Sequence, residues 1–185
     1  MINLRKVQSG RSMIEMLGVL AIVGVLSAGG IAGYSMAMED YKTNLLIERM
    51  QLIQTKVRTL CKNGDYTGLS NTTLINSGKV NSKDLENPFG GNLDVARSGF
   101  GSAAFHIDAQ NIPSDACVAI VQSYWGGIDS LVHVHIRGSK GQVGFHYDET
   151  TAYANSMSYY NYPATATDAI NACNADNLKV YVVLY

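Results

Sequence analysis

The chain has 185 residues, of which 46% are apolar and 16% charged, and its formal net charge at pH 7 is −1. This length allows one modest domain with an appendage. A charge near zero, without a block of Lys or Arg, argues against nucleic acid as the main partner, and we expect no direct nucleic-acid binding.

A long apolar run begins close to the N-terminus. Between Met13 and Met38 the only charged residue is Glu15. About 20 apolar residues span the hydrocarbon core of a bilayer, so this run is long enough for a transmembrane helix. A cleavable secretory signal with a cut near Gly33 is the alternative, but the run exceeds the roughly 7–15 apolar residues typical of such signals.

The helical pattern continues beyond the run. Apolar residues recur at intervals of three and four, which indicates one apolar helix face: Leu46, Met50, Ile53, Val57 and Leu60. No proline interrupts residues 11–62, and Asn63-Gly64 is a stop signal. The sequence therefore predicts one helix over residues 11–62. It is apolar all round over 11–38 and amphipathic over 39–62, where its apolar face packs on the following domain.

Residues 63–185 are expected to form a small α+β head. Two alternating segments around a two-residue turn predict a β-hairpin, Asp129–Gly138 with Gly141–Glu149. A terminal strand is predicted over Asn177–Tyr185, and its apolar run Val180–Leu184 indicates burial in a sheet. Residues 63–101 are rich in glycine and asparagine and are expected to be mostly loop, lying between the long helix and the sheet.

Two short helices are predicted near the later cysteines. One begins after the caps Ser114 and Asp115 and carries Cys117, and the other occupies Thr165–Ala175 and carries Cys173. With Cys61 the chain has three cysteines, which allow three single pairings. Cys61 follows the apolar helix face and is predicted to be a buried thiol. A redox role is disfavoured because the chain has no CxxC motif.

Three histidines form the best metal-like group in the chain. His133 and His135 share a strand face, and the two-residue turn places His133 opposite His146. Histidines paired on a strand can bind zinc, but no acid or cysteine completes the set convincingly. We therefore expect no metal, no cofactor and no catalytic residue. A membrane-anchored metal-binding protein or enzyme that uses these histidines stays as the alternative from another class.

Several stretches carry a family resemblance. Gly10-Arg11-Ser12-Met13-Ile14-Glu15 resembles the class III prepilin signal, in which a glycine precedes the cut and an acid follows at the fifth mature position. Three further stretches match bundle-forming pilins in content and order: LENPFGGNLDV, IPSDACVAIV and AINACNADNLKVYVVLY. Over essentially its whole length the chain resembles type IV pilins of the type IVb branch. It departs from them in its leader, which is shorter than many, and in Arg11, where the family usually has an apolar residue.

The resemblance implies how the N-terminus is processed and used. Residues 1–10 would be a leader that is cut between Gly10 and Arg11, and Arg11 would then be N-methylated. Glu15 would neutralise the N-terminal ammonium of a neighbouring subunit. An acid buried in a membrane is costly alone and is relieved by pairing, so this contact would favour docking. Arg11 and Glu15 are also four residues apart and can pair within one helix, and both pairings can coexist.

The resemblance also implies the fold and the function. The fold would be the pilin "lollipop", a long apolar helix of which residues 11–38 form the filament core, packed on a small head with an antiparallel-rich sheet. A disulfide between Cys117 and Cys173 would bound the C-terminal region. The protein would be a structural subunit, not an enzyme, of a type IVb pilus for adhesion, aggregation or DNA transfer. The alternative within the class is a minor pilin or pseudopilin that primes a filament.

The implied partners follow from assembly. The chain would bind copies of itself in a helical polymer and would meet a prepilin peptidase, an assembly ATPase and a platform protein. The precursor would lie in the bacterial inner membrane, and the product would be an extracellular pilus.

The apolar run contains five glycines: Gly18, Gly24, Gly29, Gly30 and Gly33. Each costs about 1 kcal/mol relative to alanine in a helix. They either mark a weak point where the helix unwinds locally in a filament or permit close packing between helices.

Overall fold

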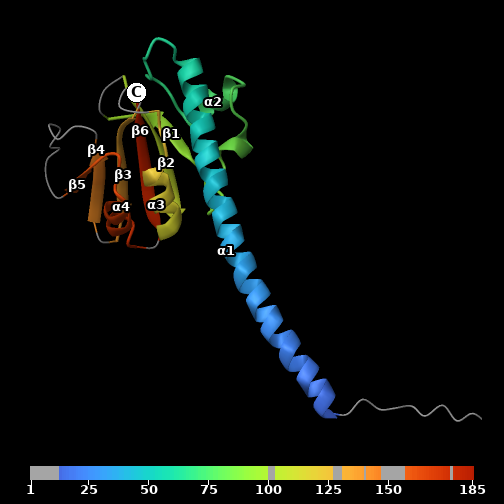
Figure 1. The fold of residues 1–185 in the computed structure, drawn as a ribbon. Coiled ribbons are helices and arrows are strands. Elements are labelled where there is room, and N and C mark those ends of the chain that lie inside the picture. Colours follow the sequence, from blue (N-terminus) through green and yellow to red (C-terminus); the bar gives the residue numbers. More distant parts are fainter. Residues whose placement is uncertain (1–12, 100–102, 127–130, 140, 147–156, 176) are drawn as a thin grey trace, which may run out of the picture. The chain divides into compact units, whose positions relative to one another are not determined.

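The structure is a computed structural model that describes residues 13–99, 103–126, 131–139, 141–146, 157–175 and 177–185. The chain divides into two compact units, Met1–Glu39 and Asp40–Tyr185. The first contains the beginning of helix α1, and the second contains the rest of α1 with all other elements (Figure 1).

Helix α1 runs from Met13 to Leu60 without a break. The helix was expected to continue to residue 62, and in the structure it ends at Leu60, where the chain leads into a turn. The amide of Gly64 donates to the carbonyl of Cys61 at 3.0 Å, and Gly64 has a φ of +73°, a conformation that favours glycine.

Residues 63–101 hold three short elements within their loops. They are the helix α2 (Asn71–Asn76), the 3-10 helix η1 (Ser82–Leu85) and the strand β1 (Asp94–Arg97). Polar side chains form them locally. Ser70 caps α2 by accepting from the amide of Thr73, and Asn71 donates to the carbonyl of Leu93 and accepts from the amide of Val95. One asparagine therefore fixes β1 beside α2.

The head is built on a six-stranded sheet in the order β1-β2-β6-β3-β4-β5. Its other strands are β2 (Phe105–Ile112), β3 (Leu131–Gly138), β4 (Gly141–His146), β5 (Met157–Asn161) and β6 (Leu178–Leu184). All neighbours are antiparallel except β4 and β5. The predicted hairpin and terminal strand are present as β3–β4 and β6, whereas β2 and β5 were not predicted. Positions 129–130 and 147–149 of the predicted hairpin lie outside the described residues.

Two short helices complete the head, α3 (Ser114–Gln122) and α4 (Ala166–Ala172). Thr165 caps α4 by accepting from the amide of Asp168 at 3.1 Å. The prediction that Ser114 and Asp115 cap α3 is wrong. Pro113 is the N-cap, and the helix begins at Ser114 itself. A proline fits there because its extended backbone leads into the helix and its missing N–H removes one of the amides that would have no acceptor within the helix.

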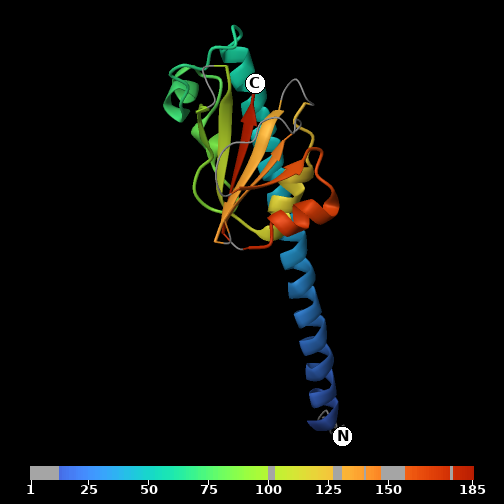
Figure 2. The ribbon, with the colours of Figure 1, turned by 90° about the vertical axis from the view of Figure 1, so that its left-hand side faces the viewer.

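The hydrophobic core lies between one face of the sheet and the helices. The predicted α1 stripe is fully buried at Leu46, Met50, Ile53 and Val57, in one cluster with sheet residues such as Phe105. In Figure 2 the sheet stands in front of this part of α1. Alternation along the strands turns polar side chains such as His106 and Lys179 to the other sheet face, together with the buried Val183.

The stripe yields a stability prediction. Replacing Met50, which is 0% exposed, by alanine should lower the free energy of unfolding by about 2–5 kcal/mol, because it leaves a cavity in the core. Leu52→Ala, two residues further along α1 at 39% exposure, is the matched control and should cost well under half as much. Chemical denaturation of the detergent-solubilised chain measures both. Equal costs would contradict the proposed packing of α1.

Candidate functional site

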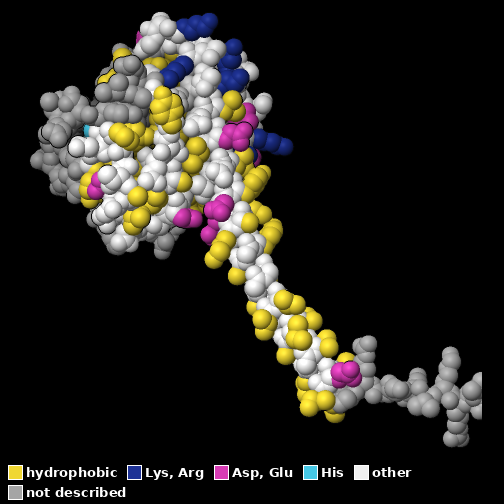
Figure 3. All heavy atoms as spheres, in the orientation of Figure 1, with side chains coloured by type: hydrophobic (Ala, Val, Ile, Leu, Met, Phe, Trp, Pro, Cys, Tyr) yellow, Lys and Arg dark blue, Asp and Glu magenta, His cyan; other side chains and the backbone are white. Residues whose placement is uncertain are grey.

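The first half of α1 exposes its apolar side chains on every side. Met13, Leu17, Val25 and Met36 are examples, each at least half exposed, and yellow side chains cover this part of the helix in Figure 3. Among the described residues, α1 is the one helix long and apolar enough to cross a membrane. Exposed apolar surface on this scale marks a site that binds lipid or protein.

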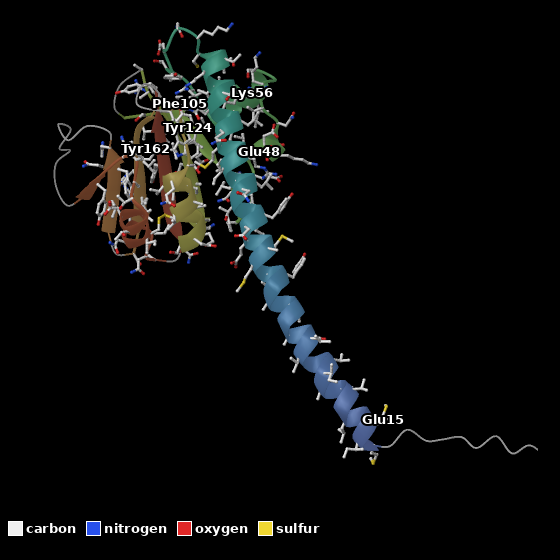
Figure 4. All side chains as sticks on the ribbon, viewed as in Figure 1. Glu15, Glu48, Lys56, Phe105, Tyr124 and Tyr162 are labelled. Carbon is white, nitrogen blue, oxygen red and sulfur yellow. A yellow bond between two sulfur atoms is a disulfide. The ribbon has the colours of Figure 1, made fainter. Side chains whose placement is uncertain are left out.

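Glu15 lies in the first turn of α1, and Figure 4 shows its side chain at the N-terminal end of the helix. An acid is favourable there because the partial positive charge of the helix dipole lies at that end. Gly10 and Arg11, the predicted cleavage and methylation residues, lie outside the described residues. The structure therefore places Glu15 among exposed apolar neighbours and leaves its pairing with Arg11 as an expectation.

The second half of α1 also binds the head through polar side chains. Gln54 is buried and donates to the carbonyl of Trp125 at 3.1 Å, and the neighbouring Gln51 donates to the carbonyl of Tyr124 at 3.2 Å. Arg58 donates to the carbonyl of Tyr185 at 3.0 Å. A buried amide without a partner would be costly, so these bonds fix the position of the head on residues 40–60. The apolar spacing gave no sign of these contacts.

The disulfide joins Cys117 in α3 to Cys173 at the end of α4, with an S–S distance of 2.03 Å and a Cα–Cα distance of 5.8 Å. Both cysteines are fully buried. The bond closes a loop with a sequence separation of 56 residues and ties the two helices together on the core face of the sheet. Fixing so long a loop restricts the unfolded chain strongly.

Cys61 is a free cysteine of intermediate exposure. The prediction of a buried thiol is therefore wrong in degree, because Cys61 is only partly buried: it packs against the edge of the core just beyond the end of α1 at Leu60. Partial burial raises the pKa of the Cys61 thiol, and the nearby Asp65 carboxylate raises it further. A raised pKa keeps the thiol protonated and unreactive.

The predicted histidine register is confirmed. His133 and His146 are direct partners across β3 and β4, and their rings stack with centroids 4.8 Å apart. The His133 and His135 centroids are 6.5 Å apart. Among the residues that the structure describes, no three His, Cys, Asp or Glu side chains are placed to hold a metal ion.

The histidine environments favour the neutral imidazole. Burial, followed by the positive charges that His146 and His135 acquire when protonated, lowers the pKa of His133 to about 3. Burial also lowers the pKa of His135 and of His146.

An ion pair on the same sheet face was not predicted. Lys179 Nζ on β6 lies 2.7 Å from Asp108 Oδ2 on β2, and Asp108 is buried. Burial raises the pKa of the Asp108 carboxyl more than the Lys179 ammonium lowers it. The alternation of Phe105, Ile107 and Ala109 with polar residues is the signal that would have revealed β2 and placed Asp108 on its outer face.

Comparisons with known proteins agree with this architecture. The family model described as "PilS N terminal" matches residues 40–184. The major structural subunit of bundle-forming pilus from Escherichia coli O127:H6 is 25% identical over 186 residues, covering 96% of this chain and 95% of the relative. The toxin coregulated pilin of Vibrio cholerae is 25% identical over 129 residues, covering 63% of this chain and 58% of the relative.

Two solved structures share the fold. The crystal structure of TcpA, a type IV pilin from Vibrio cholerae El Tor biotype, superposes with a TM-score of 0.53 at 15% identity, covering 77% of this chain and 98% of TcpA. The type IVb pilin from Salmonella typhi gives a TM-score of 0.50 at 20% identity, covering 74% of this chain and 95% of that pilin.

The disulfide yields the second prediction. Replacing Cys117 and Cys173 together by alanine should lower the free energy of unfolding by about 2–5 kcal/mol, as expected for a disulfide in a small head. Cys61→Ala is the control and should leave stability almost unchanged. Denaturant titration of the unaltered chain and of the two variants measures the stability changes. Peptide mapping under non-reducing conditions identifies the linked cysteines. A mapped disulfide that contains Cys61 would contradict the assignment.

Proposed function

The chain belongs to the PilS N-terminal family and is a type IVb pilin, a structural subunit and not an enzyme; from this premise we propose that it polymerises through residues 13–38 of α1. The observation that carries the proposal is the exposure of apolar side chains all round this segment. In the assembled pilus, these segments from many copies would form the core and the heads would form the surface.

One apolar segment serves two successive environments in this proposal. Before assembly, residues 13–38 anchor the precursor in the bacterial inner membrane, where about 20 apolar residues suffice to span the bilayer. During assembly, the segments of neighbouring copies replace the lipid. Because the segment is apolar throughout, neither environment leaves a large polar surface unsatisfied.

Glu15 supplies the polar exception and sets the register. A carboxylate surrounded by apolar side chains is costly until it finds a positive partner. After cleavage between Gly10 and Arg11, the new N-terminal ammonium of a neighbouring copy would be that partner. Arg11 can meanwhile pair with Glu15 within its own helix, four residues away. The cost of the lone acid therefore favours docking at one axial position.

The glycines of the segment are explained by the filament rather than by contacts within one chain. A Cβ added at Gly18, Gly24, Gly29, Gly30 or Gly33 would meet nothing within 4 Å, so contacts within the described chain require none of them. Each lowers helix propensity, and small residues allow helices to approach one another closely. Close approach of neighbouring copies, or local unwinding inside the filament, would explain their presence.

The assembly partners follow from this scheme. A prepilin peptidase would cut the leader and methylate Arg11, an assembly ATPase would drive polymerisation, and an inner-membrane platform protein would hold the growing base. A relative described as a major structural subunit supports the same role here over that of a minor pilin that primes the filament. A major subunit should dominate filaments sheared from the cell surface, whereas a minor one should be scarce there.

Processing at Gly10 yields the third prediction. Mass spectrometry of the mature protein should give a chain that begins at N-methylated Arg11. Gly10→Val should leave the unprocessed precursor in the membrane, because the bulky side chain would block the cut. A mature N-terminus near Gly33 would instead indicate an ordinary secretory signal and would refute assembly through residues 13–38.

Glu15 yields the fourth prediction. Glu15→Gln removes the charge with little change in volume, so it should reduce the yield of surface filaments by about tenfold or more, because the docking contact loses its ion pair. Electron microscopy and immunoblotting of sheared filaments measure the yield. Glu39→Gln removes a carboxylate further along α1 and is the matched control. Chains with this substitution should form filaments normally.

The intrachain pair is tested by the same assay. Arg11→Ala removes the guanidinium but keeps the N-terminal ammonium, so filaments should still form if the partner of Glu15 is the ammonium of another copy. Normal assembly of Glu15→Gln would contradict a docking role for Glu15.

A further inference from the structure

All four histidines of the chain lie on one face of the sheet. His106 is on β2, His133 and His135 are on β3, and His146 is on β4. Their strand neighbours Ile107, Val134 and Phe145 belong to the core, and successive side chains point to opposite faces. The histidines therefore occupy the outer face, away from the helices.

The closest contact among them bridges β3 and β4. His133 and His146 stack with their ring planes 23° apart, and His133 is only 5% exposed. Stacked neutral imidazoles attract, whereas two imidazolium ions at this distance repel. His135, on the same strand face as His133, adds a third group that would become positive on protonation.

The described charged groups on this face lie on β1, β2, β6 and β3. Tyr181 on β6 stacks with the ring of His135 at 5.4 Å. Lys179 and Arg137 approach the same tyrosine ring at 4.9 and 5.8 Å. The described carboxylates near these histidines are Asp108, paired with Lys179, and Asp94 on β1. In the strand order, both carboxylates are separated from β4 by β6 and β3.

We propose that the His133–His146 pair is an acid-sensitive latch between β3 and β4. While both rings are neutral, their stacking joins the two strands. When protons bind, like charges face each other across the ladder, and β4 separates from β3 locally. The strand β5 moves with it, because in the described sheet β5 pairs with β4 alone.

The direction of the pH dependence follows from burial. In the closed head, the pKa of His133 is lowered to about 3, whereas in an opened strand it returns to about 6.5. The opened state therefore binds more protons between these values. The latch is fully stable above pH 6.5 and loses stability as the pH falls towards 3.

The remainder of the head is less sensitive. Strands β2, β6 and β3 share the core cluster with the stripe of α1, and the disulfide holds α3 to α4. Of the described side chains on β4 and β5, Phe145 belongs to the core and stacks on Tyr160 at 5.4 Å, while Val143 and Tyr160 are partly buried. Acid should therefore open the β4–β5 edge before it unfolds the head.

Amide hydrogen exchange of the full-length chain in detergent tests the latch. Between pH 7.5 and pH 5, after correction for intrinsic exchange rates, the opening constant of the amides of residues 141–146 and 157–161 should rise at least about 30-fold. This is the ratio expected from His133 alone, with a pKa of about 3 in the closed head and about 6.5 in the opened strand. The amides of β2 and β6 should change far less. An unchanged opening constant at β4, or an equal rise across all strands, would overturn the proposal.

Variants separate the latch from general acid sensitivity. His133→Gln keeps a polar side chain but cannot gain a charge in this range, so most of the rise should disappear. His106→Gln on β2 is the matched control and should keep the full rise. If His133→Gln fails to fold, NMR titration of the imidazole signals in the unaltered chain tests the latch instead. The latch requires His133 to stay neutral at pH 5, and titration of His133 near pH 6.5 would refute it.

Discussion

The structure depends on one constraint: the first half of α1 carries an apolar surface that its own chain does not cover. Side chains from Met13 to Met36 are exposed, while those from Leu46 to Val57 on the stripe are fully buried. Apolar surface of this extent has a high free energy in water. The protein must therefore place this segment in lipid or among copies of itself, and we propose that it does both in turn.

The second half of α1 has a different role, because it binds the head. The stripe enters the core, and Gln51, Gln54 and Arg58 bond to carbonyls at separate points of the head. The disulfide then holds α3 and α4 on the same face of the sheet. A filament surface is exposed to shear and proteases, and a head held by covalent and buried polar contacts suits that position. Among the described elements, the helices lie on the core face of the sheet, and the histidines lie on the opposite face.

Sequence patterns predicted the elements whose signals were strong and local. The i, i+3, i+4 spacing predicted the buried stripe of α1, and the two-residue turn predicted the register that faces His133 with His146. Residues alone left three cysteine pairings open, and the family resemblance selected the pairing that the structure contains. The strand β2 was missed although Phe105, Ile107 and Ala109 alternate with polar residues, whereas the pairing of Asp108 with Lys179, far away in the sequence, left no local signal to predict it. Cys61 was misjudged because the helix ends one residue before it.

A near-atomic structure of the assembled filament would show whether residues 13–38 join the copies. We expect residues 13–38 of neighbouring copies to pack together along the filament axis, with each Glu15 carboxylate within ion-pair distance of the N-terminal ammonium of another copy. A filament in which these segments contact only their own chain, with the heads alone joining the copies, would contradict it.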